Sequence, residues 1–360
     1  MGTCILSVVP RGYLPWLRGG LEITASLLIE QLLGKSVIGH IAAASARAES
    51  GLLARALRKV LGPYCRVRWV QRHQVHTDLF HPFSLGSLVA RLRPSVVVCH
   101  VSGADVVSRV IALDLPTLFY VHDARIAGLF ANVGRLRRYR FAAESAFIAR
   151  LIAAETGEPV AIIRPVMPPE AYRVESGGDS VLVVNPHPLK GGDKVVEIAA
   201  ALQHRHFIVA GGWASACQQP EVIALEHALA RLPNVERVLH CEDLRSVFRR
   251  SRCLLMPCVV EEAFGRTAAE ALIAGVPVVA SDRGALPETV GCGGLMLSPD
   301  APTCDWLSAI ESLFLDNGQH SRLVAAALRQ AAEPSRQPEY VGRQISALLD
   351  ELLDATLELV

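Results

Sequence analysis

Two carboxylates stand eight positions apart in a segment whose residues could bind a phosphorylated sugar. Glu262 and Glu270 flank Ala-Phe-Gly-Arg-Thr-Ala-Ala, and the apolar run Ala-Leu-Ile-Ala-Gly-Val-Pro-Val-Val follows. A helix that begins near Gly265 would contain Glu270 and leave Glu262 on the preceding loop, because eight residues slightly exceed two helical turns. The pattern predicts loop, helix, loop and strand, with the two acids on either side of one helix N-terminus.

The N-terminus of such a helix is suited to bind an anion. Its first-turn amides lack partners within the helix, and with the positive end of the helix dipole they favour a phosphate or diphosphate. An ionised carboxylate only accepts hydrogen bonds, so Glu residues beside this site would hold sugar hydroxyls. The pair therefore points to a sugar nucleotide. Taken alone, the segment leaves open an amphipathic helix with two solvated Glu residues.

A second anion-binding turn is predicted upstream, between an apolar strand and a helix. The strand begins at Val181, the turn contains Lys190, Gly191 and Gly192, and apolar residues with helical spacing follow from Lys194. Glycine lets the backbone approach a ligand closely, and Lys supplies a compact charge for phosphate oxygens. An ordinary strand-to-helix turn with a solvated Lys is the alternative.

Together these segments resemble the large family four of retaining glycosyltransferases. The family has the GT-B fold, two Rossmann-like, doubly wound α/β domains facing a cleft. Its motifs are a Lys-Gly turn, two Glu residues with seven residues between them, and a downstream Gly-Val-Pro-Val-Val-Ala-Ser. Here they are Lys190-Gly191, Glu262 with Glu270, and residues 275–288. The resemblance is densest over residues 181–288 and thinner before them.

The resemblance implies a role for each matching position. Lys190 and Gly191 would bind the donor diphosphate, and Glu262 would bind hydroxyls of the transferred sugar. Glu270 would bind the ribose. Lys190 and Glu262 are thus the expected catalytic residues of this half of the chain. The phosphates would also lie against the backbone of the turn formed by Phe264, Gly265, Arg266 and Thr267.

One position departs from the family pattern. Many members have an Arg five residues before the Lys, as a second cation on the diphosphate, whereas this chain has Asn185. An amide can donate a hydrogen bond but brings no charge. We expect Asn185 to remain a donor-binding residue, and we expect Arg266 to supply the missing positive charge.

The first half of the chain should contribute loops at the carboxyl ends of its strands, where open α/β sheets bind ligands. Gly19 and Gly20 precede a predicted helix from Leu21, and the resemblance implies that their backbone approaches donor and acceptor; simple turn geometry is the alternative. His122 ends an apolar strand. The resemblance implies that it is a catalytic residue in contact with the transferred sugar, although a lone His is more often structural. Asp123 could orient this imidazole or cap the next helix.

Composition and spacing exclude several other classes of protein. The 360 residues are 51% hydrophobic and 20% charged, with a formal net charge of +1, as in a folded two-domain chain with no nucleic-acid partner. The nine Cys contain no C-x-x-C pair and indicate reduced thiols. The twelve His show no metal-ligand spacing, so we expect no metal and no cofactor. No G-x-G-x-x-G follows the first strand, which disfavours a dinucleotide oxidoreductase.

Short apolar runs alternate with helical stretches along the chain, as in parallel doubly wound sheets. In the first half, strands are predicted at residues 4–9, 36–41, 67–70, 95–101, 117–121, 146–148 and 160–163. In the second half they are predicted near residues 181, 207, 235, 253 and 278. We expect an acceptor-side domain at residues 1–170 and a nucleotide-sugar-binding domain at 171–336. By the resemblance, a final helix at 337–360 would return toward the first domain.

A dense basic cluster packs four Arg into the six positions 135–140. It could meet an anionic acceptor, a phospholipid surface or solvent. No apolar run approaches the roughly 20 residues that a spanning helix needs, and the N-terminus lacks the pattern of a signal peptide. The expected location is the cytoplasm, with peripheral contact to the inner face of a membrane left open.

The expected reaction is glycosyl transfer from a nucleoside-diphosphate sugar without a metal. Negative charge builds on the departing diphosphate, where Lys190, the helix amides and Arg266 would stabilise it. Retention of anomeric configuration is implied by the resemblance, although nothing in the sequence identifies a nucleophile of the kind that retaining glycosidases use. A GT-B sugar-nucleotide epimerase, a phosphorylase and a catalytically silent nucleotide-sugar binder stay open as alternatives. The sequence does not select the donor base, donor sugar, acceptor, linkage or oligomeric state.

Overall fold

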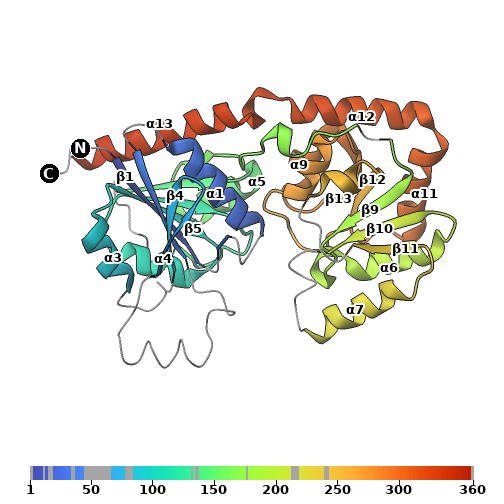
Figure 1. Cartoon of the computed structure of the whole chain (residues 1–360), viewed down its shortest axis with the longest axis horizontal. Helices are drawn as coiled ribbons and strands as arrows, with labels where there is room; N and C mark the ends of the chain where they lie inside the picture. Colours follow the sequence, from blue (N-terminus) through green and yellow to red (C-terminus); the bar gives the residue numbers. More distant parts are fainter. Residues whose placement is uncertain are drawn as a thin grey trace. The chain divides into compact units, whose positions relative to one another are not determined.

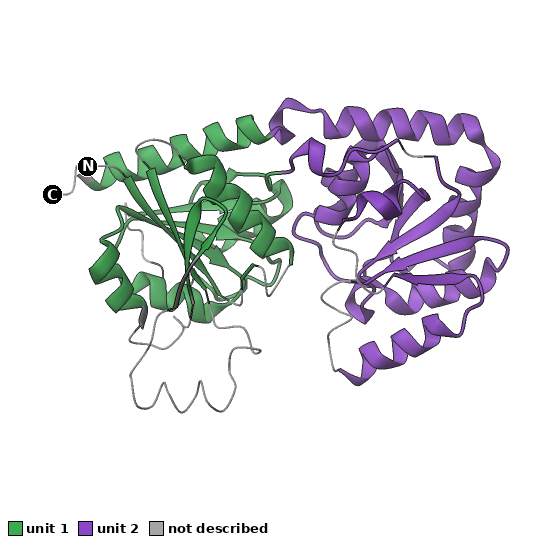
Figure 2. Cartoon of the chain, viewed as in Figure 1, with its two compact units in different colours: residues 1–166, 338–360 green, residues 167–337 purple. Residues whose placement is uncertain are grey.

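The structure is a computed structural model of the 360-residue chain. It describes residues 3–10, 13–14, 19–33, 37–43, 66–77, 84–130, 133, 138–175, 177–211, 219–238 and 243–357. The chain divides into two compact units, green and purple in Figure 2. Unit 1 comprises residues 1–166 and 338–360, and unit 2 comprises residues 167–337. Each unit has its own sheet with helices packed against it (Figure 1), so the predicted α/β class is confirmed.

Unit 1 is built on a sheet with the strand order β3-β4-β2-β1-β5-β6-β7-β8. All neighbouring strands pair in parallel except β3 and β4, which form an antiparallel hairpin. The strands are β1 (Thr3–Val9), β2 (Val37–Ala43), β3 (Arg66–Val70), β4 (His73–Thr77), β5 (Val96–Val101), β6 (Thr117–Val121), β7 (Tyr139–Ala143) and β8 (Val160–Ile162). The helices are α1 (Gly20–Leu32), α3 (Ser84–Leu92), α4 (Ala104–Ile111), α5 (Ala146–Thr156) and α13 (Pro338–Leu357).

Helix α13 belongs to unit 1 although it comes after unit 2 in the sequence. It lies against α1 (Figure 1) and adds a stripe of buried side chains to the core beneath β1. The stripe repeats at the three- and four-residue spacing of one helix face, which is why an amphipathic helix can complete this core. Its members are Val341, Ile345, Leu349 and Leu352.

One predicted strand of unit 1 is wrong. Residues 146–148 form the first turn of α5, because the hydroxyl of Ser145 accepts a hydrogen bond from the amide of Ile148 and caps a helix. Gly157, at φ 70°, ends that helix. A three-residue apolar run fits a buried helix as well as a strand, so its periodicity does not decide between them.

Two strands of unit 1 were missed. Strand β4 contains two His and a Gln, and β7 begins inside the basic cluster, so neither reads as an apolar run. Within that cluster, Arg138 pairs with Asp114 at 3.0 Å and Arg140 lies in β7. Positions 135–137 of the cluster lie outside the described residues.

Unit 2 has a fully parallel sheet with the order β11-β10-β9-β12-β13-β14. The strands are β9 (Ser180–Val184), β10 (His206–Ala210), β11 (Val235–Val238), β12 (Ser251–Met256), β13 (Val278–Ser281) and β14 (Gly294–Leu297). The five predicted strands are confirmed, and β14 was missed. The helices are η2 (Pro169–Ala171), η3 (Pro188–Lys190), α6 (Gly192–Ala201), α7 (Pro220–Ala230), α8 (Arg245–Phe248), α9 (Arg266–Ile273), α10 (Leu286–Val290), η5 (Gly291–Gly293), α11 (Thr303–Leu315), α12 (Asn317–Ala331) and η6 (Pro334–Arg336).

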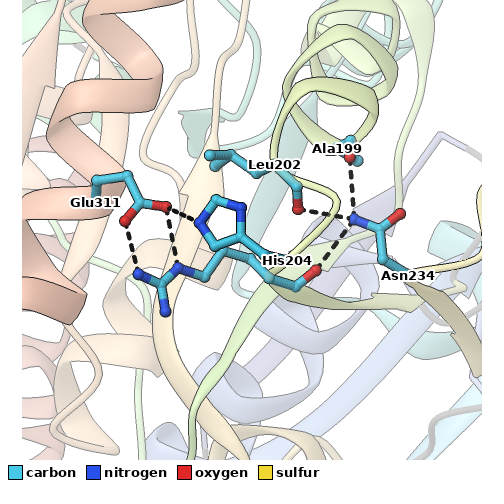
Figure 3. Close-up of polar contacts among 6 residues, drawn as sticks. Ala199, Leu202, His204, Asn234 and Glu311 are labelled. Atoms are coloured by element: carbon cyan, nitrogen blue, oxygen red, sulfur yellow. Dashed lines mark hydrogen bonds and ion pairs between the residues drawn. The ribbon is translucent and has the colours of Figure 1, made fainter.

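A polar cluster fastens the amino ends of the unit 2 strands (Figure 3). The side-chain nitrogen of Asn234, directly before β11, lies 3.0 Å from the carbonyl oxygens of Ala199, Leu202 and Arg205. Glu311 on α11 binds both His204 and Arg205. These bonds satisfy carbonyl groups at the end of α6 and before β10. They stabilise the edge of the sheet opposite the carboxyl ends, where the candidate site lies.

Candidate functional site

The predicted site residues of unit 2 follow two strands that are neighbours in the sheet. Residues 185–191 follow β9 and residues 257–266 follow β12, and these strands pair in parallel. The chain order reverses here, since β10 lies on the other side of β9. Open α/β sheets bind ligands at such a switch point, because the two loops diverge and leave a crevice at the carboxyl ends.

The loop after β9 is bent so that it touches the loop after β12. Asn185 has φ 53°, and its backbone N–H donates a hydrogen bond to the carbonyl oxygen of Ala210 at 2.7 Å. Gly191 has φ 73°, and a Cβ placed on it would lie 1.8 Å from the carbonyl oxygen of Pro257. Both the left-handed backbone and the close approach require glycine at position 191. This contact places Lys190 beside the second loop.

Lys190 and Glu262 form an ion pair across the two loops. The Nζ atom lies 2.8 Å from Oε1 of the carboxylate, and the Glu262 side chain is 15% exposed. Burial lowers the pKa of Lys190, but the charge of Glu262, the nearby Cys258 and the hydrogen bond to Glu262 together outweigh burial and raise this pKa above the ordinary value. Lys190 is therefore a fixed positive charge at neutral pH.

A buried thiol also contacts Glu262. The Sγ atom of Cys258 lies 3.6 Å from Oε1 of Glu262, and Cys258 is 1% exposed. Burial, with the nearby carboxylate, raises the pKa of Cys258 well above its usual range. The thiol therefore stays protonated and can donate a weak hydrogen bond to Glu262. No sequence motif marks Cys258, which stands in an apolar run.

The loop that contains Glu262 is held in place by hydrogen bonds from residues 281–289. Three hydrogen bonds join the two segments, and each ends on a carbonyl oxygen of the loop. The donors are the Ser281 hydroxyl to Cys258 at 2.6 Å, the Ala285 amide to Glu262 at 2.8 Å, and the Thr289 hydroxyl to Phe264. The motif at residues 275–288, together with Thr289 directly after it, thus supports the site through the backbone. Ser281 and Thr289 are positioning residues that were not predicted from the sequence.

Close packing explains the glycine in this support. Gly284 has φ 61°, and a Cβ on it would lie 2.3 Å from the carbonyl oxygen of Glu262. Any larger residue would push the loop away from the sheet. The orientation of the Glu262 carboxylate therefore depends on backbone contacts as well as on Lys190.

The predicted helix start is confirmed at Gly265, which has φ 83° and precedes α9. Glu262 stays on the loop, and Glu270 lies inside the helix with 7% of its side chain exposed. Gly265 has no side chain that could cap the first turn of the helix. This arrangement suits an anion between the two acids.

Arg266 lies against Glu270 rather than alone at the helix end. Its Nη2 atom is 3.5 Å from Oε1 of Glu270 and 3.3 Å from the hydroxyl of Tyr172. The Arg266 side chain is 10% exposed. Each acid of the motif therefore has a cation beside it. The role of Arg266 on a diphosphate stays a prediction.

In unit 1, the glycine pair lies at the start of α1, after β1. Gly20 is the first residue of the helix, and the amide of Gly19 donates to the Glu22 carboxylate at 3.0 Å. Glu22 is buried. The backbone contact to a donor stays a prediction for both glycines.

His122 is the central member of a buried chain of side chains. Its Nδ1 atom lies 2.7 Å from Oε1 of Glu144, and its Nε2 atom lies 2.8 Å from Nδ1 of His100. The His122 side chain is 4% exposed, and burial, with the charge of His122, holds the pKa of His100 well below its usual range. A sugar contact by the His122 ring stays a prediction, and it would exchange one of these bonds for a bond to the sugar. Asp123 binds Arg125.

Metal-ligand groups and membrane-spanning helices are both absent from the described residues. No group of three or more His, Cys, Asp or Glu side chains there is arranged to hold a metal ion. No helix in this part of the chain is both long and apolar enough to cross a bilayer.

The candidate site lies in a part of the chain that is similar to a known family. Residues 181–316, which contain Lys190, Glu262 and Glu270, match the family model described as Glycosyl transferases group 1. This part of the chain resembles the group 1 glycosyl transferases. The group 1 region covers the sheet of unit 2 and both loops of the candidate site, whereas Tyr172 precedes it.

Curated relatives match two fifths of the chain. A D-inositol 3-phosphate glycosyltransferase of Nocardia farcinica is 34% identical over 159 residues, which are 40% of this chain and 34% of that protein. A protein of the same name from Corynebacterium aurimucosum is 30% identical over 158 residues, 40% of this chain and 36% of that protein. The match therefore spans about a third of the length of these relatives.

Solved structures match over nearly the whole chain. Sucrose-phosphate synthase from Thermosynechococcus elongatus has a TM-score of 0.79 at 14% identity, covering 98% of this chain and 100% of that one. Anabaena Alr3699/HepE in complex with UDP-glucose has a TM-score of 0.73 at 17% identity, covering 96% and 99%. At these identities the likeness shows the fold alone. The predicted GT-B fold of two Rossmann-like domains is confirmed.

Proposed function

We propose that this protein is a glycosyltransferase that moves a sugar from a nucleoside-diphosphate sugar to an acceptor, with retention of anomeric configuration and without a metal ion. One observation carries the proposal. The Lys190–Glu262 ion pair, at 2.8 Å, stands at the switch point of a parallel sheet, directly before the glycine-capped N-terminus of α9. A cation, a carboxylate that can accept hydrogen bonds from sugar hydroxyls, and helix amides therefore lie next to one another, as the binding of a sugar diphosphate requires.

Lys190 stabilises the departing diphosphate in this proposal. Negative charge develops on the phosphate oxygen as its bond to the sugar breaks, and a fixed ammonium group beside it lowers the barrier. The raised pKa of Lys190 keeps that group charged. The backbone amides at the start of α9 and the backbone of Gly191 would hold the remaining phosphate oxygens.

Glu262 and Glu270 bind hydroxyl groups in this proposal. Lys190 and Cys258 both contact Oε1 of Glu262. Within the described part of the chain, Oε2 thus stays available to accept hydrogen bonds from the transferred sugar. Glu270 would accept from the ribose. The UDP-glucose in the HepE structure supports a nucleoside-diphosphate sugar as the donor class.

Retention would follow from a same-face substitution. The bond between the anomeric carbon and the diphosphate oxygen breaks, the acceptor oxygen bonds to that carbon on the same face, and the diphosphate takes the acceptor's proton. No protein nucleophile is needed, and this part of the proposal is supported by the family.

Calorimetric titration of UDP-, GDP-, dTDP- and ADP-sugars in the presence of EDTA tests the donor class. The wild type should bind one donor, and Glu270→Gln should bind that donor about tenfold or more weakly, as expected for the loss of a hydrogen bond to a charged group. The matched control is Glu311→Gln, which removes a carboxylate at the opposite edge of the same sheet. Failure of the wild type to bind any of the four donors would refute the proposal.

Product analysis tests the reaction. Binding without release of nucleoside diphosphate, across a panel of sugar and lipid acceptors, would indicate a silent binder. An inverted anomer in the product would refute retention. Conversion of the donor without any acceptor would indicate an epimerase.

A further inference from the structure

Tyr172 lies beside the candidate site although it stands before the matched family region. It directly follows η2 at the start of unit 2 and is separated in sequence from every motif of the site. Its ring packs against a small apolar cluster that contains Phe264, Ala269 and Ile273. Phe264 belongs to the anion-binding turn, and the other two lie on α9. The tyrosine therefore contacts the helix that bears Glu270.

The hydroxyl of Tyr172 faces the ion pair of that helix. It accepts a hydrogen bond from Nη2 of Arg266 at 3.3 Å, and the same nitrogen lies 3.5 Å from Oε1 of Glu270. Burial, with the charge of Glu270, raises the pKa of Tyr172, so the phenol is neutral. One nitrogen of Arg266 is thus held between a phenol oxygen and a carboxylate oxygen.

The helix alone would hold Arg266 poorly. Arg266 is the first residue of α9, where the positive end of the helix dipole disfavours a cation. The order of the two residues along the helix also weakens the ion pair. A basic residue four positions before an acidic one pairs less well than an acidic residue four positions before a basic one. A partner from outside the helix is needed to fix the guanidinium against Glu270, and the Tyr172 hydroxyl is in place to do so.

We propose that Tyr172 is a positioning residue of the donor site, which sets Arg266 against Glu270 and so directs the Glu270 carboxylate toward the ribose of a nucleoside diphosphate. This inference rests on the proposed function. It extends the site by one residue that no motif marks. It also gives Arg266 a task that needs no contact with the diphosphate.

UDP binding to the full chain, measured by calorimetry with GDP, dTDP and ADP as parallel probes, tests this role. Tyr172→Phe removes only the hydroxyl and should weaken binding about 3- to 10-fold, as expected for one hydrogen bond. Tyr139→Phe, which alters a buried tyrosine of unit 1, is the matched control and should leave binding unchanged. Thermal unfolding of each variant shows whether it is folded.

A double-mutant cycle separates positioning from general packing. In a Glu270→Gln background, Tyr172→Phe should have little further effect on UDP binding, because the hydroxyl acts through that carboxylate. Equal losses in both backgrounds would overturn the inference. Arg266→Gln breaks the same link from the other side and should weaken binding at least as much as Tyr172→Phe; normal affinity in both variants would also overturn it. Absence of nucleotide binding in the wild type would instead refute the proposed function, and this inference with it.

Discussion

The ammonium group of Lys190 lies 2.8 Å from the carboxylate of Glu262, although the two residues follow different strands of the unit 2 sheet. Each group of the ion pair compensates the charge of the other. A diphosphate that approaches Lys190 must therefore share this cation with Glu262. The two side chains are therefore interdependent.

Replacing Lys190 with Met should lower kcat about 100-fold or more, because a positioned charge that stabilises the leaving group is lost. Release of nucleoside diphosphate measures kcat. Lys194→Met is the matched control, since Lys194 stands one helical turn further on and pairs with Glu197 instead. Similar rates for the two variants would contradict the role of Lys190.

Arg266 can act on the diphosphate directly or only through Glu270, and two ligands distinguish these cases. If it supplies the charge missing at Asn185, Arg266→Met should weaken binding of UDP by about tenfold or more and leave binding of uridine little changed. If it acts only on the ribose-binding carboxylate, both ligands should lose affinity equally. Competition calorimetry measures both affinities.

The buried thiol of Cys258 should help to orient Glu262. Cys258→Ala removes the donor and should lower kcat several-fold, whereas Cys258→Ser keeps a donor and should restore most of it. Cys253→Ala, at a fully buried Cys on β12, controls for the loss of volume. Equal activity of the Ala and Ser variants of Cys258 would show that the thiol only fills space.

Unit 1 should lose stability in mild acid because it buries several neutral His residues. Burial lowers the pKa of His40 and His73, and burial, with His40 and Arg91, lowers that of His76 to about 4. A His with a lowered folded pKa contributes stability that is complete above the unfolded value near 6.5 and is lost as the pH falls below it. Between pH 7 and pH 5 the Tm of unit 1 should fall by roughly 4 °C or more.

His76→Gln is the variant that tests this cause, since it removes the titrating group at a buried position. The variant should show a shallower fall of Tm with pH than the wild type. His227→Gln, on α7 of unit 2, is the comparison and should leave the slope unchanged. A slope that is the same in all three proteins would assign the acid sensitivity to other groups.

Helix α13 should be required for the stability of unit 1. Ile345 is fully buried in the core that α13 shares with α1, so Ile345→Ala should lower the free energy of unfolding by about 2–5 kcal/mol. Leu315→Ala, at a side chain that is 76% exposed, should change it by less than about 0.5 kcal/mol. Urea unfolding measures both. A small effect of Ile345→Ala would show that unit 1 is stable without this helix.

The sequence predicted those helices and strands whose ends are marked by residues within or next to them. The strand at residues 117–121 was placed correctly because an apolar run of strand length stands between Pro116 and the polar pair His122-Asp123. The start of α9 was placed correctly because Gly265 and the spacing of the two acids mark it. The strand at 294–297 was missed because it is short, begins with Gly and forms the edge of the sheet.

Contacts between distant residues could not be predicted in the same way. Nothing near Tyr172 indicates that its hydroxyl meets Arg266, and nothing near Thr289 indicates a bond to Phe264. The first pair exists because the segment before β9 packs against α9. The second exists because β12 and β13 are neighbours in the sheet and bring the segments that follow them together. The two nitrogens of His122 illustrate the same limit, since each is bonded to a residue from another strand or from the end of one.

The contact between Gly191 and Pro257 bears on the engineering of donor specificity. At this point two backbones touch with no room for a methyl group between them. A chimera that received only one of the two loops from another glycosyltransferase would have to reproduce this fit, or its lysine and glutamate would separate. The pair of loops is therefore the smallest piece that could be exchanged as a module.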